Sequence, residues 1–241
     1  ILCSIGIDHA AYLGDTREKI GWEKAHIMRH GKPCICTDPQ PPQSVLDYAH
    51  RELAQLYLYG RDFHSYRHHG QWDFDMEMRT LASMHTTEWR NVPRPAISGA
   101  VQIQNASGAL AALAAMQDYL PITRSAVVEG MENVYIAARF QQVKACDATG
   151  ASVTVDVGHN PQAAEALAEN LARTTQPDEK VWAVFGMFAD KDMKEVARIM
   201  NRHIDRWFIT GLPKPRGATV DELSTAMQDA GVDLGKVVVC E

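Results

Sequence analysis

The C-terminal part of the chain alternates short apolar runs with segments of helical periodicity. The apolar runs are "ASVTVDVG", "KVWAVFGMF", "RWFITG" and "KVVVC", and each has the length of a strand. Between them, "NPQAAEALAENLAR", "KDMKEVARIMNRHI" and "TVDELSTAMQDAG" repeat apolar residues at helical spacing. Strands that alternate with helices are typical of a parallel sheet with helices on its faces. The pattern therefore predicts an α/β domain with a mainly parallel sheet over residues 141–241.

The first part of the chain, which we assign to a separate domain of residues 1–140, is less regular. A buried strand over residues 1–7 leads into an amphipathic helix, and "KPCICT" is a second strand, followed by a helix after the proline-rich "DPQPPQ". The polar and aromatic stretch of residues 56–92 is typical of antiparallel hairpins. Two more helices follow, "QIQNASGALAALAAMQDY" and "TRSAVVEGMENV", and Thr123 is the predicted N-cap of the second.

The composition narrows the class of partner. The 241 residues carry a formal net charge of −6 with scattered positive charges, which argues against nucleic acid or a membrane surface but not against a small anionic ligand. The five cysteines have no metal-site or redox spacing, so we interpret them as reduced thiols of a cytoplasmic protein. We expect neither a signal peptide nor a membrane span, because no apolar run approaches the roughly 20 residues that a span needs. The chain opens in a strand without Met, as if cut from a longer protein.

Two polar clusters directly follow predicted strands. Asp8 and His9 come after the first strand, and Asp156 is followed by His159 and Asn160 after "SVTV". In α/β sheets, ligands bind beyond the carboxyl ends of the strands, and a helix N-terminus favours anions. Spacing alone leaves open whether Asp156 and Asn160 meet a ligand or only cap the following helix. The charged loop of residues 186–193 is a weaker candidate of the same kind.

Lys24 and Arg139 are isolated candidates. Lys24 falls four residues after Ile20, so it can lie beside the apolar face of its helix. A desolvated lysine amine is partly neutral and can react as a nucleophile, although a lysine whose amine stays in water is the commoner case. Arg139, in "YIAARFQQV", lies near the predicted domain junction, where an arginine is more often a surface residue. We do not expect a metal site at residues 64–68, where two histidines have i,i+4 spacing in a strand-like segment.

Two common nucleotide-binding loops are missing from the sequence. There is no G-x-x-x-x-G-K-[ST], and no G-x-G-x-x-G follows any predicted strand. The C-terminal sheet is therefore a poor candidate for a dinucleotide site.

Six segments, in order along the chain, resemble the folylpolyglutamate synthase/dihydrofolate synthase family of the Mur ligase superfamily. "SIGIDHAAYLGDTREKIGWEKAHIM" is similar to that family's Asp-His pair followed by Glu-Lys-Ala on a helix. "VQIQNASGALAAL" resembles its Gln- and Asn-containing helix, "ARFQQV" its arginine junction, and "VTVDVGHNPQAA" its Asp-x-x-His-Asn-Pro turn. "VFGMFADKD" and "PRGATVDEL" match later segments of the family.

The resemblance implies a fold and an activity. Residues 1–140 would be the remainder of a Mur-ligase-type central ATPase domain, and residues 141–241 a Rossmann-like domain on the glutamate side. The activity would be an ATP-dependent ligation of L-glutamate to dihydropteroate or reduced folate through an acyl phosphate. The protein would be a monomer that acts on these small molecules.

The resemblance also implies a metal site. His9 would bind Mg²⁺ at the phosphates of ATP. Lys24 would be carboxylated by CO₂, and its carbamate would serve a second Mg²⁺. That modification requires a neutral amine, which the apolar helix face beside Lys24 would favour.

The remaining implied site residues contact the substrates. Asn105, Arg139 and Asp156 would contact ATP, and Arg139 would also take part in catalysis. His159 would lie by the incoming glutamate and the reacting groups, and Asn160 would support that loop.

The sequence departs from the family pattern in three places. The family's phosphate-binding loop and acidic Mg²⁺ ligand precede the position where this chain begins, and "YIAAR" replaces the usual Pro-Gly before the arginine. The chain also stops after "KVVVC", where the family continues with a further small-residue segment. We therefore expect the 241-residue chain alone not to turn over ATP. Two alternatives stay open at this point: another Mur-type ligase of cell-wall precursors, and an inactive truncated paralogue that acts as a binding module.

Overall fold

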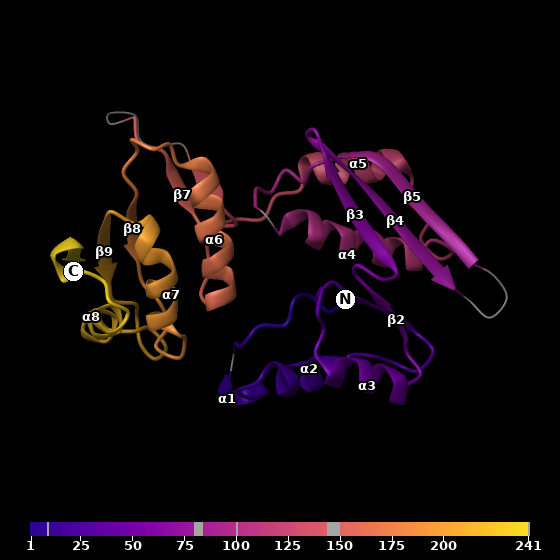
Figure 1. Ribbon diagram of the computed structural model, residues 1–241, viewed down its shortest axis with the longest axis horizontal. Coiled ribbons are helices and arrows are strands. Elements are labelled where there is room, and N and C mark those ends of the chain that lie inside the picture. Colours follow the sequence, from indigo (N-terminus) through magenta and orange to yellow (C-terminus); the bar gives the residue numbers. More distant parts are fainter. Residues whose placement is uncertain (9, 80–83, 100, 144–149, 241) are drawn as a thin grey trace. The chain divides into compact units, whose positions relative to one another are not determined.

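The chain divides into two compact units, Ile1–Ala137 (unit 1) and Ala138–Glu241 (unit 2). The computed structural model describes every residue except 9, 80–83, 100, 144–149 and 241 (Figure 1). The division between the units falls just before the boundary that the sequence suggests, between residues 140 and 141. Among the described residues, no helix has both the length and the apolar character needed to cross a membrane.

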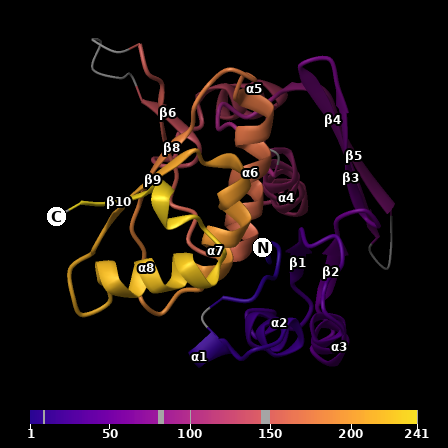
Figure 2. The same cartoon turned by 60° about the vertical axis from the view of Figure 1, so that its left-hand side comes forward.

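A three-stranded parallel sheet, in the order β10-β9-β8, forms the centre of unit 2. Its strands are β8 (Trp182–Phe185), β9 (Arg206–Thr210) and β10 (Val237–Cys240). The helices of the unit are α6 (Pro161–Thr174), α7 (Met193–Met200), α8 (Val220–Asp229) and the short 3₁₀ helices η1 (Asn201–His203) and η2 (Leu234–Lys236). In Figure 2, α7 lies between α6 and α8, and it contacts both. The predicted α/β class with a mainly parallel sheet is confirmed.

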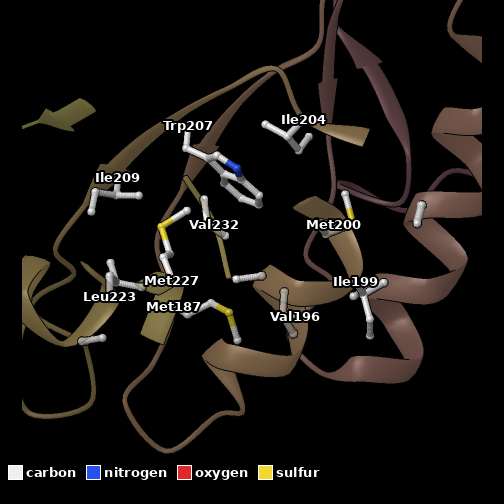
Figure 3. Close-up of a cluster of buried hydrophobic side chains, with 14 residues drawn as sticks. Met187, Val196, Ile199, Met200, Ile204, Trp207, Ile209, Leu223, Met227 and Val232 are labelled. Carbon is white, nitrogen blue, oxygen red and sulfur yellow. The ribbon is translucent and has the colours of Figure 1, made fainter. Parts of the chain in front are cut away.

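Side chains from the three α-helices and one face of the sheet form a single core (Figure 3). Trp207 and Ile209, two residues apart on β9, both point into it and are at most 1% exposed. On the opposite face, Trp182 is 65% and Val184 is 82% exposed. All three helices therefore cover the same face, whereas the sequence pattern predicted helices on both faces.

The apolar run at residues 151–158 is not a fourth parallel strand, so this prediction is wrong. Its strand β7 (Val153–Val155) pairs antiparallel with β6 (Gln141–Val143) in a separate two-stranded ribbon. The Gln142 side chain strengthens the pair by donating from Nε2 to Thr154 Oγ1 at 2.7 Å. The apolar pattern predicted the strand, but the partner comes from the segment that directly precedes it, which the pattern did not specify.

In unit 1, a parallel pair of strands is covered on both faces. β1 (Pro33–Cys36) pairs with β2 (Gln55–Leu58). Cys34 and Cys36 pack towards α2 (Arg17–Ala25) and α3 (Gln43–Arg51), while Ile35 packs in the cluster that contains α4 (Gln102–Ala115). Burial on both faces explains why this strand has no polar alternation. Burial also raises the pKa of Cys36 to about 11, so its thiol stays protonated near neutral pH.

The predicted hairpins are confirmed as a three-stranded antiparallel sheet of β3 (Phe63–His68), β4 (Gln71–Arg79) and β5 (Met84–Pro93). Trp72 and Phe74 on its inner face are fully buried in the cluster that also contains residues of α4. Figure 1 shows this helix beside the sheet. The helix α5 (Arg124–Asn133) lies against β5. Thr123 caps α5 as predicted, because Ala126 N–H donates to Thr123 Oγ1 at 3.3 Å.

The beginning of the chain differs from the predicted strand and continuous helix. Leu2 makes a single parallel bridge with Cys36, and Ser4–Asp8 form no regular strand. The helical segment is split into α1 (Ala10–Leu13) and α2, because Gly14 adopts a φ of +99° that ends the first helix. Thr16 then caps α2 by accepting from Lys19 N–H at 3.2 Å.

Close packing of α4 on the loop after β1 gives a first testable prediction. A Cβ on Gly108 would overlap Thr37 Cγ2, and Thr37 is only 1% exposed. Gly108→Ala is therefore expected to lower the free energy of unfolding by about 1–3 kcal/mol through overpacking. In α5, a Cβ on Gly130 would meet nothing within 4 Å. Gly130→Ala should therefore raise the free energy of unfolding by about 0.5–1 kcal/mol. Urea denaturation measures both, and equal effects would contradict the close contact.

Candidate active site

The Asp156 carboxylate, directly after β7, joins two loops of unit 2. Its Oδ2 accepts a hydrogen bond from Phe140 N–H at 2.8 Å, and its Oδ1 accepts one from Gly158 N–H at 2.7 Å. The first donor follows Arg139 and the second precedes His159. This half-buried side chain therefore ties the arginine loop to the histidine loop. We call this arrangement the Asp156 bridge.

The loop around Arg139 is held in an uncommon backbone conformation. Ala138 has a φ of +55° and Phe140 a φ of +46°, values that side chains other than glycine rarely adopt. Val157 N–H donates to the Ala138 carbonyl at 3.0 Å, and the Phe140 side chain is buried. Both neighbours of Arg139 are thus anchored while its own side chain is exposed. A strained loop that the surrounding structure holds in place is typical of functional sites.

His159 and Asn160 continue this loop into α6. Asn160 Oδ1 accepts from Ala163 N–H at 2.9 Å, so Asn160 is the N-cap of α6 and Pro161 is its first residue. The exposed His159 ring lies with Nδ1 2.9 Å from the Val157 carbonyl, which requires the proton on Nδ1. The capping interpretation therefore holds for Asn160. Asp156 instead bonds to the arginine loop and to Gly158.

The charged loop at residues 186–193 has structural partners. Arg216 donates to both carboxylate oxygens of Asp190 at 3.0 and 3.2 Å, and this hydrogen bonding lowers the pKa of Asp190. The same guanidinium lies over the Phe188 ring at 4.4 Å. Asp192 caps α7 by accepting from Glu195 N–H at 3.0 Å. With these contacts, residues 186–193 form an ordinary charged loop with a capping aspartate, and nothing in them favours the loop as a ligand site.

The other predicted site residues belong to unit 1. His9 lies outside the described residues. Lys24 is in the last turn of α2 and is exposed, while Ile20 and Ala25 of the same helix are fully buried. Of the two interpretations left open for Lys24, the exposed position within unit 1 favours the commoner one, a lysine whose amine stays in water. Asn105, near the start of α4, is also exposed.

Sequence reasoning missed a set of side chains in unit 1 that hold the segment before His9. Asp38 is 3% exposed and accepts from Ile5 N–H at 2.7 Å, and Arg17 donates to the same carboxylate at 3.0 Å. The signal that could have found it is the position of Asp38 just past the end of a strand, which is also the position of Asp156.

The comparison with family models identifies the domain of unit 2. Residues 138–241 match the family model of the Mur ligase, glutamate ligase domain. The chain is 33% identical over 223 residues to the dihydrofolate synthase/folylpolyglutamate synthase of Escherichia coli, with 92% of this chain and 48% of that protein covered. The chain spans about half the length of the curated relatives it matches.

Solved structures show the same similarity over almost the whole chain. Escherichia coli FolC in complex with DHPP and ADP is 31% identical, with a TM-score of 0.81, and the match covers 99% of this chain and 51% of that one. A bifunctional folylpolyglutamate synthase/dihydrofolate synthase with Mn, AMPPNP and L-glutamate bound is 31% identical, with a TM-score of 0.77, over 98% of this chain and 56% of that one.

Proposed function

We propose that this chain belongs to the dihydrofolate synthase/folylpolyglutamate synthase family and that the full-length protein is an ATP-dependent ligase that adds L-glutamate to a folate-type acid. The acid is dihydropteroate, a reduced folate or both. The Asp156 bridge carries this proposal, because it anchors the loops of Arg139 and His159 in the unit that matches a glutamate ligase domain. The relatives with ADP, AMPPNP or L-glutamate bound support the same substrates.

In this proposal the reaction begins with phosphoryl transfer. A carboxylate oxygen of the acid attacks the γ-phosphorus of ATP, the bond to ADP breaks, and an acyl phosphate forms. Negative charge grows on the phosphoryl oxygens, and the Arg139 guanidinium offsets it. Asn105, an exposed amide, and Asp156 are the proposed further contacts of ATP. Because both Asp156 oxygens already accept backbone N–H groups, its role towards ATP includes keeping Arg139 in place.

The second step is amide formation. The neutral amine of L-glutamate attacks the acyl carbon, phosphate leaves with the former carboxylate oxygen, and the nitrogen loses one proton to the solvent as the amide forms. His159 is proposed to lie by the incoming glutamate, and the hydrogen bond from its Nδ1–H to the Val157 carbonyl orients the ring. Asn160 supports this loop by capping α6.

We propose His9 and Lys24 as the groups that would hold Mg²⁺, with two ions in the complete site. In the part of the chain that the structure describes, no three His, Cys, Asp or Glu residues gather as a metal site. An imidazole nitrogen and a carbamate oxygen are suitable ligands, and the exposed Lys24 amine is accessible to CO₂. When bound, Mg²⁺ would stabilise negative charge on the phosphates.

Two features favour a folate acid over a cell-wall precursor and an active ligase over an inactive relic. The Escherichia coli relative is named for folate ligation, and the match covers 92% of this chain. The Asp156 bridge keeps strained residues beside Arg139, a cost that a pure binding module has no chemical reason to retain. We further propose that the protein is cytoplasmic and monomeric. Light scattering on the full-length protein would test the monomer.

An ADP-release assay tests the proposed function. With the full-length protein as its gene encodes it, ADP release is expected only when ATP, Mg²⁺, L-glutamate and dihydropteroate or a reduced folate are all present. ADP release that does not depend on the acid or on L-glutamate would contradict the proposal. The 241-residue chain alone is expected to be inactive in the same assay.

A further inference from the structure

The backbone of Ile5 is held at both of its polar groups by side chains from distant segments. Ile5 N–H donates to Asp38 Oδ2 at 2.7 Å, and the Ile5 carbonyl accepts from Arg17 Nε at 2.8 Å. Ile5 itself is 2% exposed and lies in the segment that runs into Asp8 and His9. Regular secondary structure does not satisfy these groups, since Ser4–Asp8 form no strand. The side chains of Arg17 and Asp38 supply the hydrogen bonds that a strand would otherwise provide.

The two side chains are also bonded to each other and to the loop after β1. Arg17 Nη2 donates to Asp38 Oδ2 at 3.0 Å and to the Gln40 carbonyl at 2.9 Å. Asp38 Oδ1 accepts from Gln40 N–H at 2.9 Å. The Asp38 side chain is 5% exposed, so its charge depends on these donors, whereas Arg17 is 44% exposed. We call this pair with its backbone partners the Arg17–Asp38 clamp.

The clamp connects the elements that carry the proposed metal and nucleotide groups of unit 1. Arg17 is the first residue of α2, and Lys24 is in the last turn of that helix. At the other side of the clamp, Gln104 Nε2 of α4 donates to the Thr37 carbonyl at 2.6 Å and to Ser4 Oγ at 3.4 Å. Gln104 directly precedes Asn105. The segment before His9, the helix of Lys24 and the helix of Asn105 therefore meet at residues 37–38.

From this arrangement we infer that Arg17 and Asp38 are positioning residues of the metal site, which they serve by fixing the His9 segment against the helix of Lys24. The inference rests on the proposed function. Neither side chain needs to touch the ion: they act through backbone that leads to its ligands. Removing a partner that bonds a metal ligand directly lowers metal affinity by about 10- to 100-fold, and because this clamp acts four residues before His9, its expected effect lies at or below the lower end of that range.

The test is Mn²⁺ binding to the full-length protein in the presence of AMPPNP, followed by electron paramagnetic resonance. Asp38→Asn keeps the size of the side chain but puts an amide in place of one carboxylate oxygen, so one of its donors loses its acceptor. We expect Asp38→Asn and Arg17→Lys to weaken Mn²⁺ binding by about 3- to 10-fold. In the ligase assay, excess Mg²⁺ should restore kcat, while the KM for L-glutamate changes less than about twofold, since the glutamate groups lie in unit 2.

The control is Arg198→Gln, which breaks an exposed bidentate ion pair with Glu195 on α7 and should leave Mn²⁺ binding unchanged. Thermal unfolding separates positioning from folding. If Asp38→Asn does not fold, Arg17→Lys decides, because Arg17 is substantially exposed. A folded variant with wild-type Mn²⁺ affinity overturns the inference, and so does a wild type that binds no Mn²⁺. Wild-type Mn²⁺ binding without folate-dependent ADP release would overturn the proposed function alone.

Discussion

Replacing Arg139 by alanine in the full-length protein is expected to lower kcat by about 10²- to 10³-fold, because one charged donor to the transferring phosphoryl group is lost. The free energy of unfolding should change by no more than about 0.5 kcal/mol, since the side chain is exposed and its neighbours hold the loop. Steady-state rates of ADP release measure the effect. Arg206→Ala, which removes another exposed arginine of unit 2, is the matched control and should keep full activity.

Combining substitutions of Asp156 and Arg139 tests whether the Asp156 bridge acts through Arg139. If Asp156 acts by aiming Arg139, Asp156→Asn should lower kcat by about 10- to 100-fold in the wild type and by clearly less in the Arg139→Ala background. Equal factors in both backgrounds would show that Asp156 acts independently of the arginine. An Arg139→Ala protein with wild-type kcat would exclude Arg139 from the phosphoryl step.

Lys24→Met is expected to lower kcat by about 10²-fold or more, because a carbamate that serves a metal ion contributes several kcal/mol to charge stabilisation. The exposed amine of Lys24 can exchange CO₂ with the solution. Wild-type activity should therefore fall in bicarbonate-depleted buffer and recover when bicarbonate is added, whereas Lys24→Met should not respond.

The control for Lys24 comes from the same helix. Lys19 is also exposed in α2, where it pairs with Asp15 at 2.8 Å, and Lys19→Met should retain activity and bicarbonate response. Carbon-13 nuclear magnetic resonance of protein in labelled bicarbonate should give a carbamate signal that Lys24→Met lacks. Bicarbonate-independent activity together with an active Lys24→Met would contradict the carbamate.

Elements with a local cause were predictable from the sequence. The N-cap of α6 could be predicted because Asn160 precedes Pro161, and that of α5 because Thr123 opens a periodic segment. The hairpins were predictable from their aromatic, alternating residues. In each case the residues that decide the structure are close in sequence.

Elements decided by distant partners were not predictable. The strand at residues 153–155 was expected in the parallel sheet, yet it pairs with residues 141–143, since a strand pattern carries no information about which edge it meets. Whether the Lys24 amine is desolvated stayed open in the sequence. Lys24 is four positions from the buried Ile20, yet it is exposed in the last turn of α2, because how far other elements cover a helix face depends on distant partners.

The candidate site shows the same limit. The strand-end rule pointed to Asp156, but the donor that explains its role is the backbone of Phe140, and nothing in the sequence suggests a positive φ at that phenylalanine. The Arg17–Asp38 clamp joins residues 21 positions apart and was missed because neither lies in a recognised motif.

The central claim is ligation through an acyl phosphate, and a heavy-oxygen label in the carboxylate of the acid substrate tests it most directly. When the full-length protein joins L-glutamate to the labelled acid, one labelled oxygen should move into the released phosphate, because the carboxylate oxygen bonds to phosphorus before the amine displaces it. Mass spectrometry of the phosphate reads the result. Formation of the glutamyl product with unlabelled phosphate would contradict the account.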